Sequence, residues 1–187
     1  MEPFARLARA LKKAKVRFIL IGVAGADYYA RSAGLLFTTQ DWDMFLPPDP
    51  DNALRAWKAC EAAGLELWLG DEPLGRPLDR FLAEQVVSRR ALVRGESGEL
   101  QIDLTLVMEG FDFEKVWQER RIFKVERVDI PVARLSHIVA SKAAAGRPKD
   151  HLFLATHEEA LRSLLRHAPK AGGRRAKKPR GSGPGCA

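Results

Sequence analysis

The sequence predicts a single mixed α/β (α+β) domain in which a mixed core β-sheet is flanked by helices and followed by a C-terminal helical pair. A chain of 187 residues with 46% hydrophobic content can bury one core and is short for two. Short apolar segments typical of strands alternate with segments that carry apolar residues at helical spacing. The last residues contain Gly, Pro, Ser and many cations. We therefore assign residues 1–169 to the domain and 170–187 to a basic tail.

The elements expected in the first half begin with an amphipathic helix over 3–15. The apolar run from Phe18 to Ile21 is typical of a strand buried on both faces, and it ends at Gly22. The next segment, from Gly22 to Arg31, is expected to be a helix packed closely against that strand. The remaining elements of this half are a strand over 38–46, a helix capped by Asp49 or Asp51 and ending at Gly64, and a strand over 65–69.

The second half is predicted to contain a β-hairpin and several helices. Residues 86–94 and 100–107 flank a Gly- and Ser-containing turn, which favours a hairpin. The other expected elements are a loop over 70–77, a helical turn over 79–84, a short helix over 111–117, one or two strands over 121–132, a helix over 134–145 stopped by Gly146, and a last helix from Pro148 to about His167.

Three aspartates are the main candidates for chemistry. Asp41 and Asp43 lie two apart on a predicted strand, so their side chains point to the same face. Asp103 lies on the polar face of another strand, opposite an apolar face that begins with Leu100 and Ile102. If the two strands are neighbours, three carboxylates converge and repel one another unless a cation is present. The pattern therefore predicts a divalent metal site.

Charge and hydropathy exclude several classes of protein. The longest apolar run, residues 18–26, is shorter than the roughly 20 residues of a membrane span, and no signal peptide is visible. We expect a cytoplasmic protein without a membrane partner. Cys60 and Cys186 provide no disulfide framework. The tail over 170–187 has six basic and no acidic residues and is expected to be disordered, serving either as a salt-sensitive RNA or DNA contact or as a solubilising extension.

Taken together, these motifs resemble the nucleotidyltransferase superfamily that includes DNA polymerase beta. The run from Phe18 to Gly22 is similar to the first strand and turn of that family, and 39–43 to its Thr-x-Asp-hydrophobic-Asp motif. Residues 141–150 are similar to the Lys-x-x-x-Gly-Arg-x-Lys-Asp stretch of minimal prokaryotic members, which include AbiE-type toxin enzymes. The resemblance spans roughly residues 16–155 and implies a nucleotidyltransferase core.

The resemblance also implies roles for the three aspartates. Nucleotidyl transfer places negative charge on the attacking and leaving oxygens, and two metal ions stabilise both. Asp41 and Asp43 are expected to hold both ions, which would be Mg²⁺ or Mn²⁺. Asp103 is expected to complete the acceptor-side ion and to help accept the proton of the nucleophile. The substrate implied is a nucleoside triphosphate (NTP).

The expected phosphate contacts come from glycines and basic residues. Gly22 and Gly25 would let the backbone at a helix N-terminus approach the triphosphate, unless they serve only close packing of helix on strand. Val23 stands where the family has a second Gly or a Ser, which departs from the pattern.

The basic candidates lie near the C-terminal end of the predicted domain. Lys142 falls on the apolar stripe of its helix, so its ammonium group either snorkels outward or reaches the triphosphate. Arg147 and Lys149 are candidate phosphate or acceptor contacts. Asp150, at the start of the last helix, is expected to be mainly structural.

The function expected from these features is transfer of a nucleoside monophosphate from an NTP to a hydroxyl group. The acceptor is left open among RNA such as tRNA, a partner protein and a small molecule, and a relation to toxin–antitoxin systems is expected. Two alternatives remain open. One is a nucleotide-sugar glycosyltransferase, which would not require Asp103. The other is a noncatalytic nucleotide- or nucleic-acid-binding module of the same fold, which Val23 favours.

Overall fold

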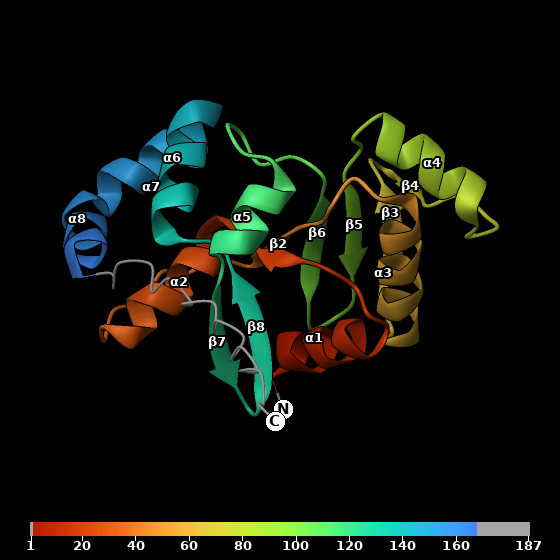
Figure 1. Cartoon of the computed structure of the whole chain (residues 1–187), viewed down its shortest axis with the longest axis horizontal. Helices are drawn as coiled ribbons and strands as arrows, with labels where there is room; N and C mark the ends of the chain where they lie inside the picture. Colours follow the sequence, from red (N-terminus) through yellow and green to blue (C-terminus); the bar gives the residue numbers. More distant parts are fainter. Residues whose placement is uncertain (1, 168–187) are drawn as a thin grey trace, which may run out of the picture.

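The computed structural model describes residues 2–167 and confirms the mixed α/β fold class (Figure 1). The predicted tail over 170–187 lies outside the described residues. The strands are β1 (Ile19–Leu20), β2 (Asp41–Phe45), β3 (Glu66–Leu69), β4 (Glu72–Pro73), β5 (Val93–Glu96), β6 (Gln101–Thr105), β7 (Arg121–Val125) and β8 (Val128–Val132). The helices are α1 (Pro3–Lys13), α2 (Gly22–Ser32), α3 (Pro50–Ala62), α4 (Arg80–Ser88), α5 (Phe113–Glu119), α6 (Leu135–Ala145), α7 (Pro148–Thr156) and α8 (Glu158–His167).

All of these strands form one mixed sheet in the order β4-β3-β5-β6-β2-β1-β8-β7. The predicted hairpin is present as the antiparallel pair β5 and β6. Strand β6 also pairs in parallel with β2, although the two are separated by about 60 residues in the chain. The two aspartate-bearing strands are therefore neighbours at the centre of the sheet. In Figure 1, α6 to α8 lie at one end of the molecule and α3 and α4 at the other.

The register of β2 and β6 aligns the predicted site residues. Asp43 is the partner of Asp103, and Asp41 is the partner of Gln101. Trp42 alternates with the two aspartates, and its ring stacks on Phe4 of α1 with centroids 4.1 Å apart and planes at 14°. Phe4 of α1 thus covers this face of β2. The opposite face is left to the carboxylates.

The first strand of the hairpin is shorter than predicted. Residues 86–88, expected to begin this strand, end helix α4 instead. Asp79 caps this helix by accepting a hydrogen bond from the Leu82 backbone N–H at 2.9 Å. Ala83 and Val86 are buried at helical spacing. A favourable cap and one buried helical stripe therefore determine the conformation of a segment whose short apolar run also suits a strand.

The predicted last helix is divided into α7 and α8. Helix α6 ends as expected at Gly146, which has a φ of 61° in the left-handed region, and Pro148 opens α7. His157 lies between α7 and α8 with a φ of −111°. Its ring contacts Phe37 with centroids 4.6 Å apart, so tertiary packing accompanies the break.

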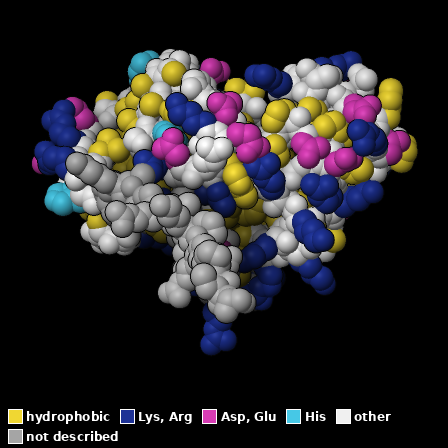
Figure 2. Space-filling model, in the orientation of Figure 1, with side chains coloured by type: hydrophobic (Ala, Val, Ile, Leu, Met, Phe, Trp, Pro, Cys, Tyr) yellow, Lys and Arg dark blue, Asp and Glu magenta, His cyan; other side chains and the backbone are white. Residues whose placement is uncertain are grey.

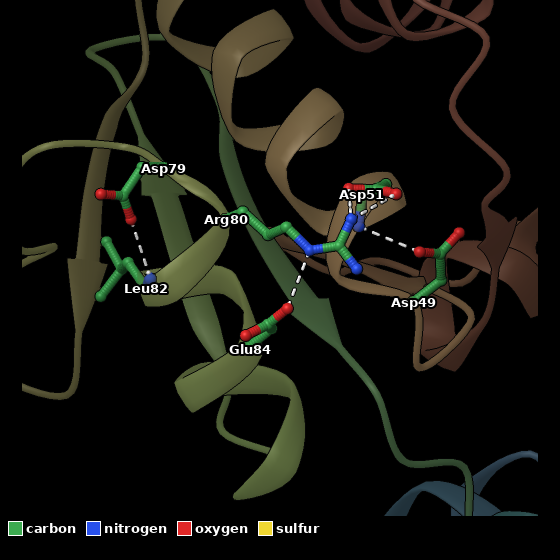
Figure 3. A network of polar contacts seen from close by, with 6 residues as sticks. All are labelled: Asp49, Asp51, Asp79, Arg80, Leu82 and Glu84. Atoms are coloured by element: carbon green, nitrogen blue, oxygen red, sulfur yellow. Dashed lines mark hydrogen bonds and ion pairs between the residues drawn. The ribbon is translucent and has the colours of Figure 1, made fainter.

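An exposed ion-pair cluster joins α3 to α4, and we call it the Arg80 cluster (Figure 3). The Arg80 guanidinium contacts Asp51 Oδ1 at 3.2 Å and Glu84 Oε1 at 2.8 Å. The carboxylate of Asp49 accepts the Asp51 backbone N–H at 2.9 Å and caps α3. Side chains of both signs are interspersed over much of the face seen in Figure 2. No helix among residues 2–167 is long and apolar enough to cross a membrane.

Candidate active site

A cavity of about 750 Å³ opens between the polar face of β2 and β6 and the helices α6 and α7. This size is in the range of sites for small ligands. All three predicted aspartates line it, and so do the predicted phosphate contacts except Gly25. The lining residues that carry charge are Asp41, Asp43, Arg94, Asp103, Glu109, Lys142, Arg147 and Lys149. The cavity therefore has an acidic floor on the sheet and a basic wall on the helices.

Asp41 is oriented by neutral groups. The Gln101 side-chain amide donates a hydrogen bond to Asp41 Oδ1 at 2.7 Å, from the partner position on β6. The Asp41 backbone N–H donates to Thr39 Oγ1 at 3.2 Å. We did not predict a site role for Gln101. The signal for it was present, because Gln101 shares a strand face with Asp103.

Asp43 is the cavity carboxylate whose ionisation is most affected by burial. Burial raises the pKa of Asp43 to about 6, and the neighbouring charge of Asp103 contributes to the rise, whereas Lys142 and Lys149 act in the opposite direction. Among the described residues no hydrogen bond or ion pair involves its carboxylate. The Asp43 carboxylate is thus held close to a like charge without a direct partner, which is a common feature of functional sites.

Gly22 lies directly beside Asp43 at the turn from β1 to α2. Its φ of 66° is in the left-handed region, and a Cβ added to it would lie 1.9 Å from Asp43 Oδ2. Only glycine can occupy this position without displacing the carboxylate. Gly25 has another environment, because its added Cβ would meet Ile138 Cδ1 and the Leu20 carbonyl oxygen, each at 3.1 Å. Gly25 therefore permits close packing and does not line the cavity.

Asp103 forms a bidentate ion pair with Arg94, its cross-strand partner on β5. Arg94 Nε lies 2.9 Å from Asp103 Oδ1, and Nη2 lies 3.3 Å from Oδ2. Arg94 is a cavity residue that we did not predict from the sequence. The available signal was the hairpin itself, since its register places Arg94 and Asp103 opposite each other on one face.

A second charged cluster, which we call the Asp150 cluster, holds the basic wall. Asp150 is fully buried at 0% exposure, and its two oxygens accept Lys142 Nζ and Arg147 Nε, both at 2.7 Å. The Lys142 ammonium also lies 5.1 Å from the centroid of the Phe153 ring. Although burial would raise the pKa of Asp150, the hydrogen bonds from Lys142 and Arg147 lower it. Lys142 thus points inward and lines the cavity rather than snorkelling to the surface.

The three cavity aspartates differ in whether their carboxylates are free to bind a metal ion. Across residues 2–167, no group of three or more His, Cys, Asp and Glu side chains is arranged to hold a metal ion. Asp103 faces Arg94, whereas within the same residues Asp41 and Asp43 share one strand face and have no ion-pair partner. Carboxylate oxygens are the ligands that Mg²⁺ prefers, and this ion retains several waters. Asp41 and Asp43 fit such an ion, and the predicted ligand role of Asp103 stays a prediction.

The rim of the cavity on the β5–β6 side is partly apolar. Leu92, Val107 and Met108 line it beside Glu109. Leu92 and Val107 are exposed large hydrophobic residues. The two sides of the cavity therefore suit different parts of a ligand, a polyanion on the basic wall and a less charged group on the rim.

Comparisons with known proteins provide little beyond this geometry. No protein-family model matches the chain, and no match is found among curated proteins. Among solved structures, a crystal structure of ANT(2″)-Ia in complex with adenylyl-2″-tobramycin is similar, with a TM-score of 0.48 and 12% sequence identity over 86% of this chain and 91% of that chain. At this level of similarity the likeness says nothing about the activity of the present chain.

Proposed function

We propose that this protein is a metal-dependent nucleotidyltransferase that moves a nucleoside monophosphate from an NTP to a hydroxyl acceptor. One observation carries the proposal: Asp41, Asp43 and Asp103 lie on the floor of a cavity whose facing wall carries Lys142 and two further cations. An acidic floor repels a triphosphate unless a divalent cation lies between them, and a basic wall attracts it. This combination suits an anionic substrate that arrives together with a metal ion.

The proposed reaction is a displacement at phosphorus. The acceptor oxygen forms a bond to the α-phosphorus, the bond from that phosphorus to the bridging oxygen breaks, and pyrophosphate leaves with the electron pair. The acceptor hydroxyl loses its proton, for which Asp103 is the proposed acceptor. A divalent cation, when bound, offsets the negative charge that develops on the reacting oxygens. Asp41 and Asp43 would hold it.

The basic wall has the role of binding the triphosphate. Lys142, whose ammonium group pairs with the buried Asp150, lines the cavity together with Arg147 and Lys149 at the start of α7. Gly22 brings the backbone of the β1–α2 turn to the edge of the same cavity. These groups would hold the phosphates so that the α-phosphorus faces the aspartates.

The acceptor remains open among RNA such as tRNA, a partner protein and a small molecule. A toxin–antitoxin relation is a prediction from the sequence resemblance alone. Whether RNA is the acceptor can be tested separately. If the basic tail contributes to RNA binding, deletion of 170–187 should weaken that binding and its dependence on salt.

A noncatalytic nucleotide-binding module is the second candidate. The ion pair between Arg94 and Asp103 favours it, because both oxygens of that carboxylate already accept hydrogen bonds from the guanidinium. Val23, which lines the cavity where the resembling family has Gly or Ser, favours it as well. Both features leave nucleotide binding on the basic wall intact.

The test is label transfer from each α-phosphate-labelled NTP with Mg²⁺ or Mn²⁺, offered bulk tRNA or cell extract. We expect transfer by the full chain and its loss in Asp41→Asn and Asp43→Asn. Asp51→Asn, which changes an exposed aspartate of the Arg80 cluster, is the matched control and should remain active. Metal-dependent nucleotide binding without transfer to any acceptor would instead support the binding module.

A further inference from the structure

Arg94 and Asp103 form a preassembled pair in the cavity. They face each other across β5 and β6, and two nitrogens of the guanidinium contact the two carboxylate oxygens, at 2.9 and 3.3 Å. Such fork-to-fork geometry adds directional specificity to the strength of a charge-assisted hydrogen bond. Asp103 therefore has a fixed cationic partner before any ligand enters.

The pair leaves little of Asp103 for another cation. Its side chain is 13% exposed, whereas that of Arg94 is 42% exposed, so the guanidinium is the more open member of the pair. Mg²⁺ coordinates oxygen at about 2.1 Å and would lie close to the guanidinium if it bound the same carboxylate. The two like charges would repel each other in a partly buried site.

Asp41 and Asp43 differ from Asp103 in this respect. The only side-chain partner of the Asp41 carboxylate within residues 2–167 is the neutral amide of Gln101, on Oδ1. No hydrogen bond or ion pair to the Asp43 carboxylate is found in the same part of the chain. One divalent cation on this pair, together with the positive charge of Arg94, balances the three carboxylates. Among the charged side chains that line the cavity on β2, β5 and β6, a second divalent cation would leave excess positive charge.

We infer that Arg94 takes the place of a second metal ion: the cavity binds one divalent cation, on Asp41 and Asp43, while Arg94 alone holds Asp103. The inference rests on the proposed function, since it concerns the same metal site. Arg94 is in this view a positioning residue, which directs Asp103 and blocks it as a metal ligand. This one-ion arrangement differs from the two-ion arrangement that the sequence resemblance implies.

The test counts bound Mn²⁺ on the full chain by electron paramagnetic resonance, with Mn²⁺ alone and no nucleotide. We expect one ion on the wild-type protein and none on Asp41→Asn. Arg94→Gln should bind a second ion, because Asp103 then has no cationic partner, and the double variant Arg94→Gln/Asp103→Asn should return to one. Asp103→Asn, which is isosteric, should keep the single ion.

Arg80→Gln is the matched control, because it also removes an arginine from between acidic side chains, but in the exposed Arg80 cluster. It should bind one ion, as the wild type does. Two ions on the wild type, or loss of the ion in Asp103→Asn, would overturn the inference even if label transfer is observed. A count of one that rises to two only in Arg94→Gln would support it even if no acceptor is labelled, in which case only the transfer reaction fails.

Discussion

The Arg80 cluster and the Asp150 cluster have opposite arrangements of charge and opposite exposure. In the first, a cation lies among acidic side chains, and the side chains of Arg80, Asp51 and Glu84 are each about half exposed or more. In the second, one carboxylate with no exposed surface lies between two cations. Water can replace the partners of Arg80 but cannot reach Asp150. The same kind of ion pair therefore has little energetic weight in one place and much in the other.

The two clusters also differ in what they position. The Arg80 cluster joins α3 to α4, at the end of the molecule opposite α6 and α7 (Figure 1). The Asp150 cluster joins α6 to α7 and holds the side chains of Lys142 and Arg147, two residues that line the cavity. Removal of the buried Asp150 carboxylate is therefore expected to cost much of the folding free energy. The two cations that it holds lie where a substrate is proposed to bind.

The largest effect is expected for Asp150→Ala. Removing the carboxylate leaves the Lys142 ammonium, whose side chain is 12% exposed, without its ion-pair partner. We expect the free energy of unfolding at pH 7 to fall by about 2 to 4 kcal/mol, measured by urea denaturation. Asp51→Ala provides the comparison on the surface. Equal losses in the two variants would contradict the distinction between the clusters.

Gly22→Ala is expected to have the next largest effect, because Asp43 leaves no room for a side chain at this position. The new Cβ would collide with Asp43 Oδ2 and would also require a non-glycine residue at a φ of 66°. We expect a loss of about 2 to 3 kcal/mol in thermal or urea unfolding. Gly34→Ala is the matched control, since Gly34 has a φ of 74° and nothing within 4 Å of its added Cβ. A loss no greater than that of Gly34→Ala would show that Asp43 simply moves aside.

Asp43→Asn should increase stability, in contrast to Asp150→Ala. The pKa of Asp43 is raised from 3.8 to about 6, so the folded state binds this proton more tightly than the unfolded chain does. The contribution of Asp43 to wild-type stability therefore decreases as the pH rises from about 4 to above 6, whereas the Asp43→Asn variant lacks this penalty. At pH 8 with EDTA, we expect the variant to gain on the order of 1 to 2 kcal/mol, discounted because Asp43 is partly exposed.

This gain should disappear at pH 4, where the wild-type carboxyl group is protonated in the folded state. Urea denaturation of the wild type and of Asp43→Asn at pH 4 and pH 8 measures this difference in stability. A gain of the same size at pH 4 would show that charge is not the cause.

Arg80→Ala should have the smallest effect. Its ion pairs are exposed, so we expect a loss below about 1 kcal/mol, and less in high salt because ions screen surface charges. Urea denaturation at low and high NaCl concentration tests this. A loss as large as that of Asp150→Ala would mean that the Arg80 cluster is a structural anchor despite its exposure.

Local patterns in the sequence determined much of the fold and part of the site. The period of two in β2 put Asp41 and Asp43 on one face and Trp42 on the other, where it stacks on Phe4. Caps and breakers placed Asp49 at the start of α3 and Gly146 at the end of α6. These features depend on neighbours within a few residues, which a single segment contains.

Only the tertiary structure decided which of these groups meet. The parallel pairing of β2 with β6 and its register, which align Asp43 with Asp103, join segments about 60 residues apart. The same holds for Arg94, which takes Asp103 as its partner across two strands. The burial of Ala83 and Val86, which accompanies the Asp79 cap, likewise decided that residues 86–88 end a helix instead of opening a strand. Strand order, register and burial arise from long-range packing. The sequence by itself therefore identified the carboxylates, and the fold determined that Asp103 pairs with Arg94 whereas Asp41 and Asp43 have no ion-pair partner among residues 2–167.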